Sequence, residues 1–143
     1  MHRYLVIANQ TLGGEPLLGR IRELARAGDS GFHVLVPATP PRDHAWTEGE
    51  ASAVATGRLE AALRRFARLG VEADGEVGDA NPMLAIEDAI RDRGPFEAIV
   101  LSTLPPGISR WLKLDLPHRV ESGFGMRVIH VIGEPEPATG GTS

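Results

Sequence analysis

Apolar residues gather in five short runs, separated by longer segments of helical periodicity. The runs lie at residues 4–8, 32–36, 73–77, 98–101 and 127–132. Continuous aliphatic and β-branched runs are typical of parallel strands that are covered on both faces. The run at 73–77 is partly polar and contains Asp74 and Glu76. It therefore predicts a strand at the edge of the sheet, where one face meets water.

The segments between these runs place apolar residues three and four positions apart, which predicts amphipathic helices. Two of them carry clear start signals. Thr47 and Glu50 have the spacing of a capping box, and Asn81 is followed by Pro82 in the first helical position. Gly70 is expected to end the second helix. Strands and helices therefore alternate along the chain.

This alternation predicts an α/β fold, a single-domain open parallel five-stranded sheet with helices on both faces. A chain of 143 residues is long enough for one such core. We expect the domain to cover residues 1–133. Residues 134–143 are Pro, Gly and small polar residues with two glutamates and one alanine, and we expect a disordered C-terminal tail there.

Composition narrows the function classes. The net charge is −4 and no run of Lys or Arg occurs, so nucleic acid and anionic membrane surfaces are not expected partners. The chain has no cysteine, which excludes disulfides and thiol catalysis. No apolar run approaches the roughly 20 residues of a membrane helix, and the N-terminus has no signal-peptide pattern. We therefore expect a cytoplasmic protein that does not interact with membranes.

The first candidate site follows the fourth strand, at the carboxyl edge where open α/β sheets bind their ligands. Ser102, Thr103, Gly107, Ser109 and Arg110 cluster there in the sequence. One interpretation is a site for a polar or anionic ligand in which Arg110 supplies the charge. The alternative is structural: the hydroxyls satisfy backbone groups at the strand end, and Ser109 caps a short helix.

The end of the first strand belongs to the same predicted crevice. Asn9 and Gln10 close that strand, and their amides would either hold a ribose or base edge or tie down the turn. The loop at residues 38–46 contains Pro40 and Pro41 and is expected to cover the crevice.

The sequence offers little for catalysis. The five histidines show no metal-ligand spacing, and we expect His33 and His130, which lie inside strands, to be hydrogen-bonded structural residues. Asp43-His44 has the composition of a catalytic dyad, but no nucleophile stands beside it. We assign no catalytic residue and no metal.

Several segments resemble the universal stress protein family, and the resemblance extends over residues 3–132. They are YLVIANQTLGGEPLL, VGDANPMLAIEDAI, LPPGISRWLKLDLPHRV and RVIHVI. The resemblance implies the strand order 3-2-1-4-5, also seen in related adenine-nucleotide hydrolases, and a crevice between strands 1 and 4. It further implies dimers through the last strand. Many members bind ATP through a G-x-x-G-x9-G-[ST] signature.

This chain departs from the signature. We align Val120 with the equivalent valine of the family. The three glycines of the signature then correspond to Leu101, Leu104 and Leu114, and its final Ser/Thr corresponds to Asp115. A looser register uses Gly107 as the second glycine, and the other two are still missing.

These replacements have physical consequences. Leucines prevent the close approach of backbone amides to phosphate oxygens. Asp115 stands two residues before Pro117 and is expected to cap the last helix, with its carboxylate at the helix start. Asn9 stands where the family usually has an acidic residue. ATP and other nucleotides are therefore disfavoured as cofactors.

The preferred hypothesis is a non-catalytic binding or regulatory protein of the universal stress type, with an altered crevice for a smaller polar or anionic ligand. Alternatives are an interaction module with a vestigial crevice, a stress protein that binds ATP in the usual way, or a small hydrolase or transferase of the same superfold. We also expect a homodimer through the strand that begins at Arg127 and ends at Ile132, because neither a proline nor an acidic residue protects that edge.

Overall fold

The structure is a computed structural model that describes residues 1–40 and 45–134 of the chain. Three sequence predictions fall outside this range: the Asp43-His44 pair, the middle of the loop at 38–46, and residues 135–143 of the tail.

Five parallel strands form one sheet in the order β3-β2-β1-β4-β5. The strands are β1 (His2–Ile7), β2 (Ser30–Pro37), β3 (Glu72–Gly78), β4 (Ala98–Thr103) and β5 (Val128–Ile132). The helices are α1 (Glu15–Ala27), α2 (Glu48–Arg68), α3 (Pro82–Arg93), α4 (Arg110–Lys113) and α5 (Leu116–Phe124). The α/β class, the strand order and the position of β3 at an edge are confirmed.

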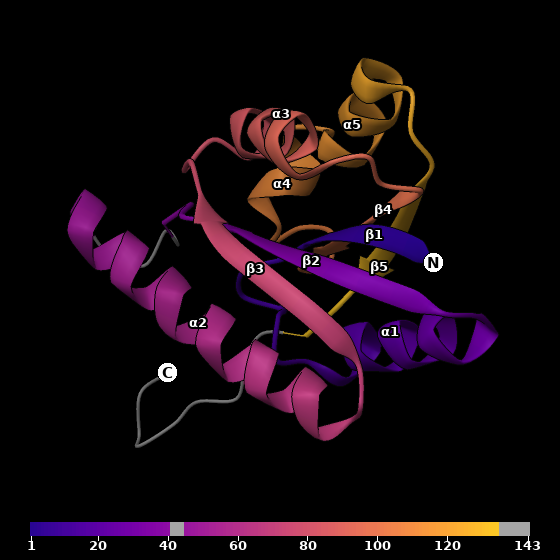
Figure 1. The fold of residues 1–143 in the computed structure, drawn as a ribbon. Helices are drawn as coiled ribbons and strands as arrows, with labels where there is room; N and C mark the ends of the chain where they lie inside the picture. The colour runs from indigo at the N-terminus through magenta and orange to yellow at the C-terminus, as the bar shows by residue number, and fades with distance from the viewer. Residues whose placement is uncertain (41–44, 135–143) are drawn as a thin grey trace.

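Helices cover both faces of the sheet. Figure 1 shows α1 and α2 on one face and α3, α4 and α5 on the other. Each face has its own core, since alternate residues of a strand point to opposite sides. On β4, Val100 packs in the core beneath α1 and α2, whereas Ile99 and Leu101 pack in the core beneath α3 and α5.

The local helix signals act as the sequence predicts. Thr47 Oγ1 accepts a hydrogen bond from the backbone N–H of Glu50 at 3.1 Å. Asn81 Oδ1 accepts from the backbone N–H groups of Met83 at 3.0 Å and Leu84 at 3.4 Å. These bonds satisfy amides that the first turn of a helix leaves without partners, so α2 and α3 begin at fixed residues.

The structure corrects the prediction that the Asp115 side chain caps the last helix. Asp115 holds the N-cap position of α5, but its side chain makes no capping hydrogen bond, and its backbone is left-handed at φ 55° and ψ 40°. It is the only non-glycine residue with positive φ in the part of the chain that the structure describes. Its side chain is exposed. Asp115 therefore stands at the start of the last helix, but the expected capping hydrogen bond from its carboxylate is not formed.

The two edges of the sheet differ in chemistry. The edge strand β3 carries Glu72, Asp74 and Glu76 at alternate positions. The opposite edge, β5, reads Val-Ile-His-Val-Ile, and Ile132 is 49% exposed. Among the described residues, no helix is long and apolar enough to span a membrane.

Candidate functional site

The predicted pair Ser102 and Thr103 does not form one cluster. Both lie within β4, which extends past the predicted strand end at residue 101, so they point to opposite faces. Ser102 Oγ lies 2.6 Å from Thr11 Oγ1 in the turn after β1. Thr103 Oγ1 lies 2.8 Å from His130 Nε2 on β5. Each hydroxyl belongs to a residue at most 2% exposed and has a partner within the fold.

Asn9 ties the end of β1 to its surroundings, with Gln10 half-buried beside it. Asn9 Nδ2 donates to the backbone oxygens of Pro37 at 2.8 Å and Thr39 at 3.3 Å. Arg58 Nη1, from α2, donates to Asn9 Oδ1 at 2.6 Å. The Asn9 amide therefore has partners in the loop after β2 and in α2, and its role toward a ribose or base edge stays a prediction.

The loop after β2 begins along the carboxyl edge of the sheet. Thr39 Oγ1 donates to the backbone oxygen of Ala80, beyond β3, at 2.5 Å. Arg110 Nη1 reaches across from α4 and donates to the backbone oxygen of Pro40 at 2.9 Å. Arg110 therefore serves as an anchor for this loop. That the rest of the loop covers the crevice stays a prediction, because residues 41–44 lie outside the described range.

Ser109 and Gly107 have structural roles. Ser109 Oγ accepts from the backbone N–H of Leu112 at 3.1 Å and caps α4, as the structural alternative predicted. Gly107 is exposed and has φ 95°, a conformation that favours glycine, so it allows the turn before α4. Asp115 lies beyond α4, at the start of α5, and so belongs to a different turn from Gly107 and Ser109.

The sequence did not single out Thr11, Arg58 or Gly133 as members of this region. Gly133 follows β5 and packs against Thr11, where a Cβ atom on the glycine would lie 2.8 Å from Thr11 Cβ. Alternation along residues 98–103 is a signal that would have separated Ser102 from Thr103. No local pattern indicates that Arg58 or Gly133 reaches the end of β1.

Burial lowers the pKa of His130. The folded protein therefore favours the neutral ring, which shares its Nε2 with the Thr103 hydroxyl. A histidine beside a hydroxyl has the composition of a base and a nucleophile. Thr103 is only 2% exposed, however, so a substrate has no access to this hydroxyl in the folded chain.

His33 is also structural. It is 2% exposed, with Nδ1 2.8 Å from Asp74 Oδ1 and Nε2 2.6 Å from Glu76 Oε2. It thus connects β2 to the acidic edge strand β3, as expected for a hydrogen-bonded strand histidine. Across residues 1–40 and 45–134, no group of three or more His, Asp or Glu side chains is arranged to hold a metal ion.

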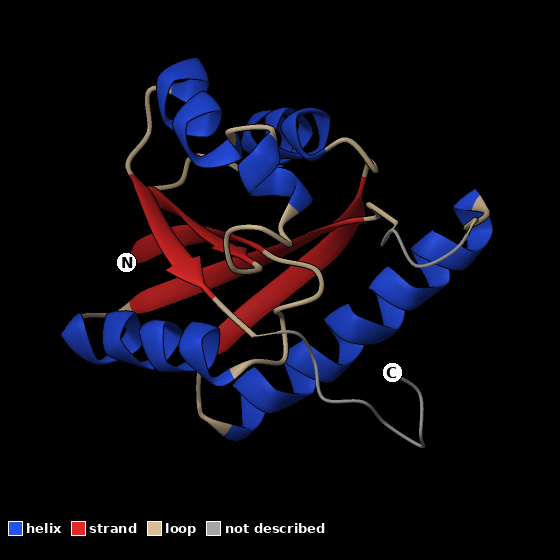
Figure 2. Cartoon of the chain, turned by 180° about the vertical axis from the view of Figure 1, so that it is seen from behind, coloured by secondary structure: helices blue, strands red, loops and turns tan. Residues whose placement is uncertain are grey.

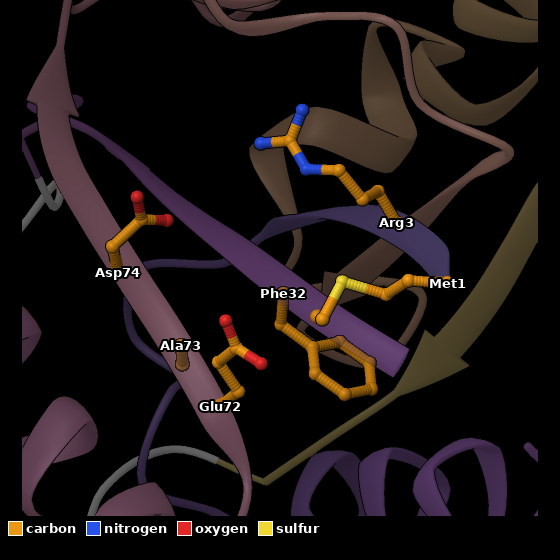
Figure 3. A pocket seen from close by; sticks show the side chains of 7 residues that line it. Met1, Arg3, Phe32, Glu72, Ala73 and Asp74 are labelled. Atoms are coloured by element: carbon orange, nitrogen blue, oxygen red, sulfur yellow. The ribbon is translucent and has the colours of Figure 1, made fainter. Parts of the chain in front are cut away.

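A separate hollow of about 280 Å³ lies at the opposite, amino-terminal edge of the sheet. Figure 3 shows it between Met1 and Arg3 on one side and Glu72 and Asp74 on the other. Gly31, which stands between Arg3 and Glu72 in the strand register, also lines it and contributes no side chain. Arg3 Nη1 already donates to the backbone oxygen of Arg93 at 2.7 Å. The hollow shares no residue with the carboxyl-edge region.

Comparisons with known proteins support the fold. No protein-family model matches the sequence, and a search of curated proteins found no match. Among solved structures, the chain is similar to a universal stress protein from Archaeoglobus fulgidus, with a TM-score of 0.62 and 17% identity. The similarity covers 92% of this chain and 93% of that chain. The chain thus has the universal-stress-type α/β fold implied by the sequence resemblance.

Proposed function

We propose that this protein is a non-catalytic binding or regulatory protein of the universal stress type. Its crevice between the carboxyl ends of β1 and β4, which we call the switch-point crevice, excludes ATP in this proposal. Its ligand in this proposal is a polar or anionic molecule smaller than ATP. The cytoplasmic location expected from the sequence is part of the same proposal.

One observation carries the proposal: the polar side chains at the carboxyl ends of β1 and β4 are bonded to the fold itself. Thr11 and Ser102 bond each other at 2.6 Å, and both ends of the Asn9 amide are engaged. A nucleotide that recruited these groups would first have to break their bonds, and each buried group left unpaired costs about 1–3 kcal/mol. The crevice therefore offers poor conditions for a large polar ligand.

The loop after β4 supports the same conclusion. Ser109 Oγ accepts the hydrogen bond of the Leu112 backbone N–H in α4, so this amide cannot at the same time donate to a phosphate. Leu104 and Leu114 stand at the positions that are glycines in the family signature. Side chains at these positions keep phosphate oxygens away from the backbone.

Titration calorimetry with Mg-ATP tests the proposal. We expect a Kd weaker than roughly 100 μM, about −5.5 kcal/mol. Mass spectrometry of the protein purified under native conditions should then identify a retained polar molecule smaller than ATP. A low-micromolar Kd for Mg-ATP would contradict the proposal and restore the ATP-binding alternative.

A second candidate function is a dimeric interaction module, and the geometry of β5 favours it. The backbone oxygen of Arg127 and the N–H of Gly133 both bond to β4, at Ile99 and Thr103. Since alternate peptide groups of a strand point to opposite sides, those of Val128, His130 and Ile132 point away from the sheet. Within the described residues, this geometry supports pairing of these groups with another strand.

A further inference from the structure

The chain does not leave the sheet directly when β5 ends. The N–H of Gly133 donates to the backbone oxygen of Thr103 at 2.8 Å, which continues the pairing with β4. The next residue, Glu134, then passes the start of α1. In Figure 2 this short segment runs from the tip of β5 past that end of α1. We refer to Gly133 and Glu134 as the strap.

Gly133 lies directly on the hydroxyl pair at the end of β4. A Cβ atom built on it would lie 2.8 Å from Thr11 Cβ, 3.0 Å from Thr11 Cγ2 and 3.3 Å from Ser102 Oγ. Gly133 is itself buried, and Ser102 is 1% exposed. The strap therefore packs against the Thr11–Ser102 pair, and a side chain at position 133 would force a neighbouring group to shift.

The backbone of Glu134 packs against Gly14, at the start of α1. Its carbonyl oxygen lies 3.3 Å, and its nitrogen 3.7 Å, from the place where a Cβ on Gly14 would be. Gly14 is the N-cap residue of α1 and provides no side chain to cap that helix. The strap thus lies between the β1–α1 turn and the end of β4. It fits there because neither Gly14, beside it, nor Gly133, within it, has a side chain.

We propose that the strap is an intramolecular closure of the switch-point crevice, and that its displacement controls access to the crevice. This inference rests on the proposed function, in which the crevice takes a small polar ligand. With the strap in place, the Thr11 and Ser102 hydroxyls bond each other. With the strap displaced, both hydroxyls and the uncapped start of α1 face solvent, where they can bond a ligand.

Thiol chemistry tests this closure, because the chain has no cysteine of its own. Ser102→Cys places a single thiol under the strap in the full-length chain. In this background, Gly133→Ala forces a methyl group against Thr11 Cβ and displaces the strap. We expect the rate of reaction with 5,5′-dithiobis(2-nitrobenzoate) to rise at least tenfold. Glu134→Ala, which keeps the backbone contacts, should leave the rate unchanged.

A second thiol distinguishes displacement of the strap from loss of the fold. Ala89 is 2% exposed on α3, on the other face of the sheet. Ala89→Cys combined with Gly133→Ala should react as slowly as Ala89→Cys alone. The proposal is overturned if the Ser102→Cys thiol reacts at the same rate with and without the Gly133→Ala substitution.

Hydrogen exchange of the unaltered chain provides an independent measurement. A strap that moves must open without unfolding the sheet, so the protection factor of the Gly133 amide should be at least tenfold below those of the β4 amides. Exchange of Gly133 only through global unfolding would show a fixed segment and overturn the proposal. Neither measurement uses a nucleotide. Tight Mg-ATP binding would therefore contradict the proposed function, whereas thiol reactivity and hydrogen exchange test the strap alone.

Discussion

Arg58 Nη1 lies 2.6 Å from Asn9 Oδ1, and this hydrogen bond connects the middle of α2 to the end of β1. The same Asn9 side chain donates through Nδ2 to Pro37 O at 2.8 Å. One buried amide therefore holds together a helix, a strand end and the loop after β2. This role requires an amide, because a carboxylate has no hydrogen to donate to Pro37.

Asn9→Ala should destabilise the protein by about 1–3 kcal/mol, since it leaves the Pro37 carbonyl without its donor and removes one acceptor from Arg58. Urea unfolding measures the loss. Faster hydrogen exchange of the Ala38 amide, which bonds Gly78 O at 3.1 Å, should accompany it. The matched control is Gln10→Ala at the half-buried neighbour, for which we expect a change within about 0.5 kcal/mol. Equal stabilities of the two variants would contradict this role of Asn9.

Asp115 carries a conformational penalty at φ 55°. Asp115→Val should lower the free energy of unfolding by about 1–2 kcal/mol, because left-handed backbone is unfavourable for a β-branched residue. Asp115→Gly should be at least as stable as the parent, since glycine adopts this conformation without strain. Thermal or urea unfolding of the three proteins gives the order. A valine variant as stable as the parent would mean that this backbone is not left-handed.

Homodimerisation through β5 remains a prediction, and the structure sharpens its test. Light scattering at micromolar concentration should give about twice the chain mass of 15.3 kDa. Ile132→Lys should yield a monomer, because it places a charge on an exposed position of the edge strand. Val131 is unsuitable for this purpose, since it is 8% exposed and belongs to the core.

Ile108→Lys is the control for that variant. Ile108 is 61% exposed but lies in the loop before α4, outside β5. Its replacement should leave the dimer intact. A parent protein that is monomeric, or an Ile132→Lys variant that stays dimeric, would show that β5 is not the contact.

The lowered pKa of His130 predicts a sensitivity to acid. Burial disfavours the charged ring in the folded state. The contribution of this residue to stability is therefore complete above the ordinary imidazole pKa, about 6.5, and falls as the pH decreases through that value towards the lowered one. His130→Gln should reduce the loss of stability across this window. An NMR titration that places the pKa of His130 above its ordinary value would contradict the sign.

The fold was predictable because its determinants are local in the sequence. Apolar runs of strand length, the Thr47 cap and the Asn81-Pro82 pair each act within a few residues. Parallel strands joined by helices then allow few topologies. The predicted end of β4 was too early, since pairing with β5 extends the strand to Thr103. The predicted capping hydrogen bond of Asp115 was wrong, since the backbone there is left-handed.

The site was less predictable, because its bonds join residues far apart in the chain. Ser102 meets Thr11, and Thr103 meets His130, on opposite faces of the sheet. Whether a hydroxyl faces a ligand or another hydroxyl depends on such partners. The passage of Gly133 over Thr11 depends on the path of the chain after the last strand, which no periodicity records.

The unequal edges of the sheet determine how large an assembly can become. β3 presents Glu72, Asp74 and Glu76, whereas β5 presents an apolar strand with peptide groups that point away from the sheet. A chain with two adhesive edges would add neighbours without limit and form fibres. This chain has one such edge, and the predicted twofold pairing of β5 with its own copy would occupy that edge in both partners. In such a dimer the outermost strands would be the two acidic β3 strands, whose like charges disfavour further pairing, so assembly would stop at two chains.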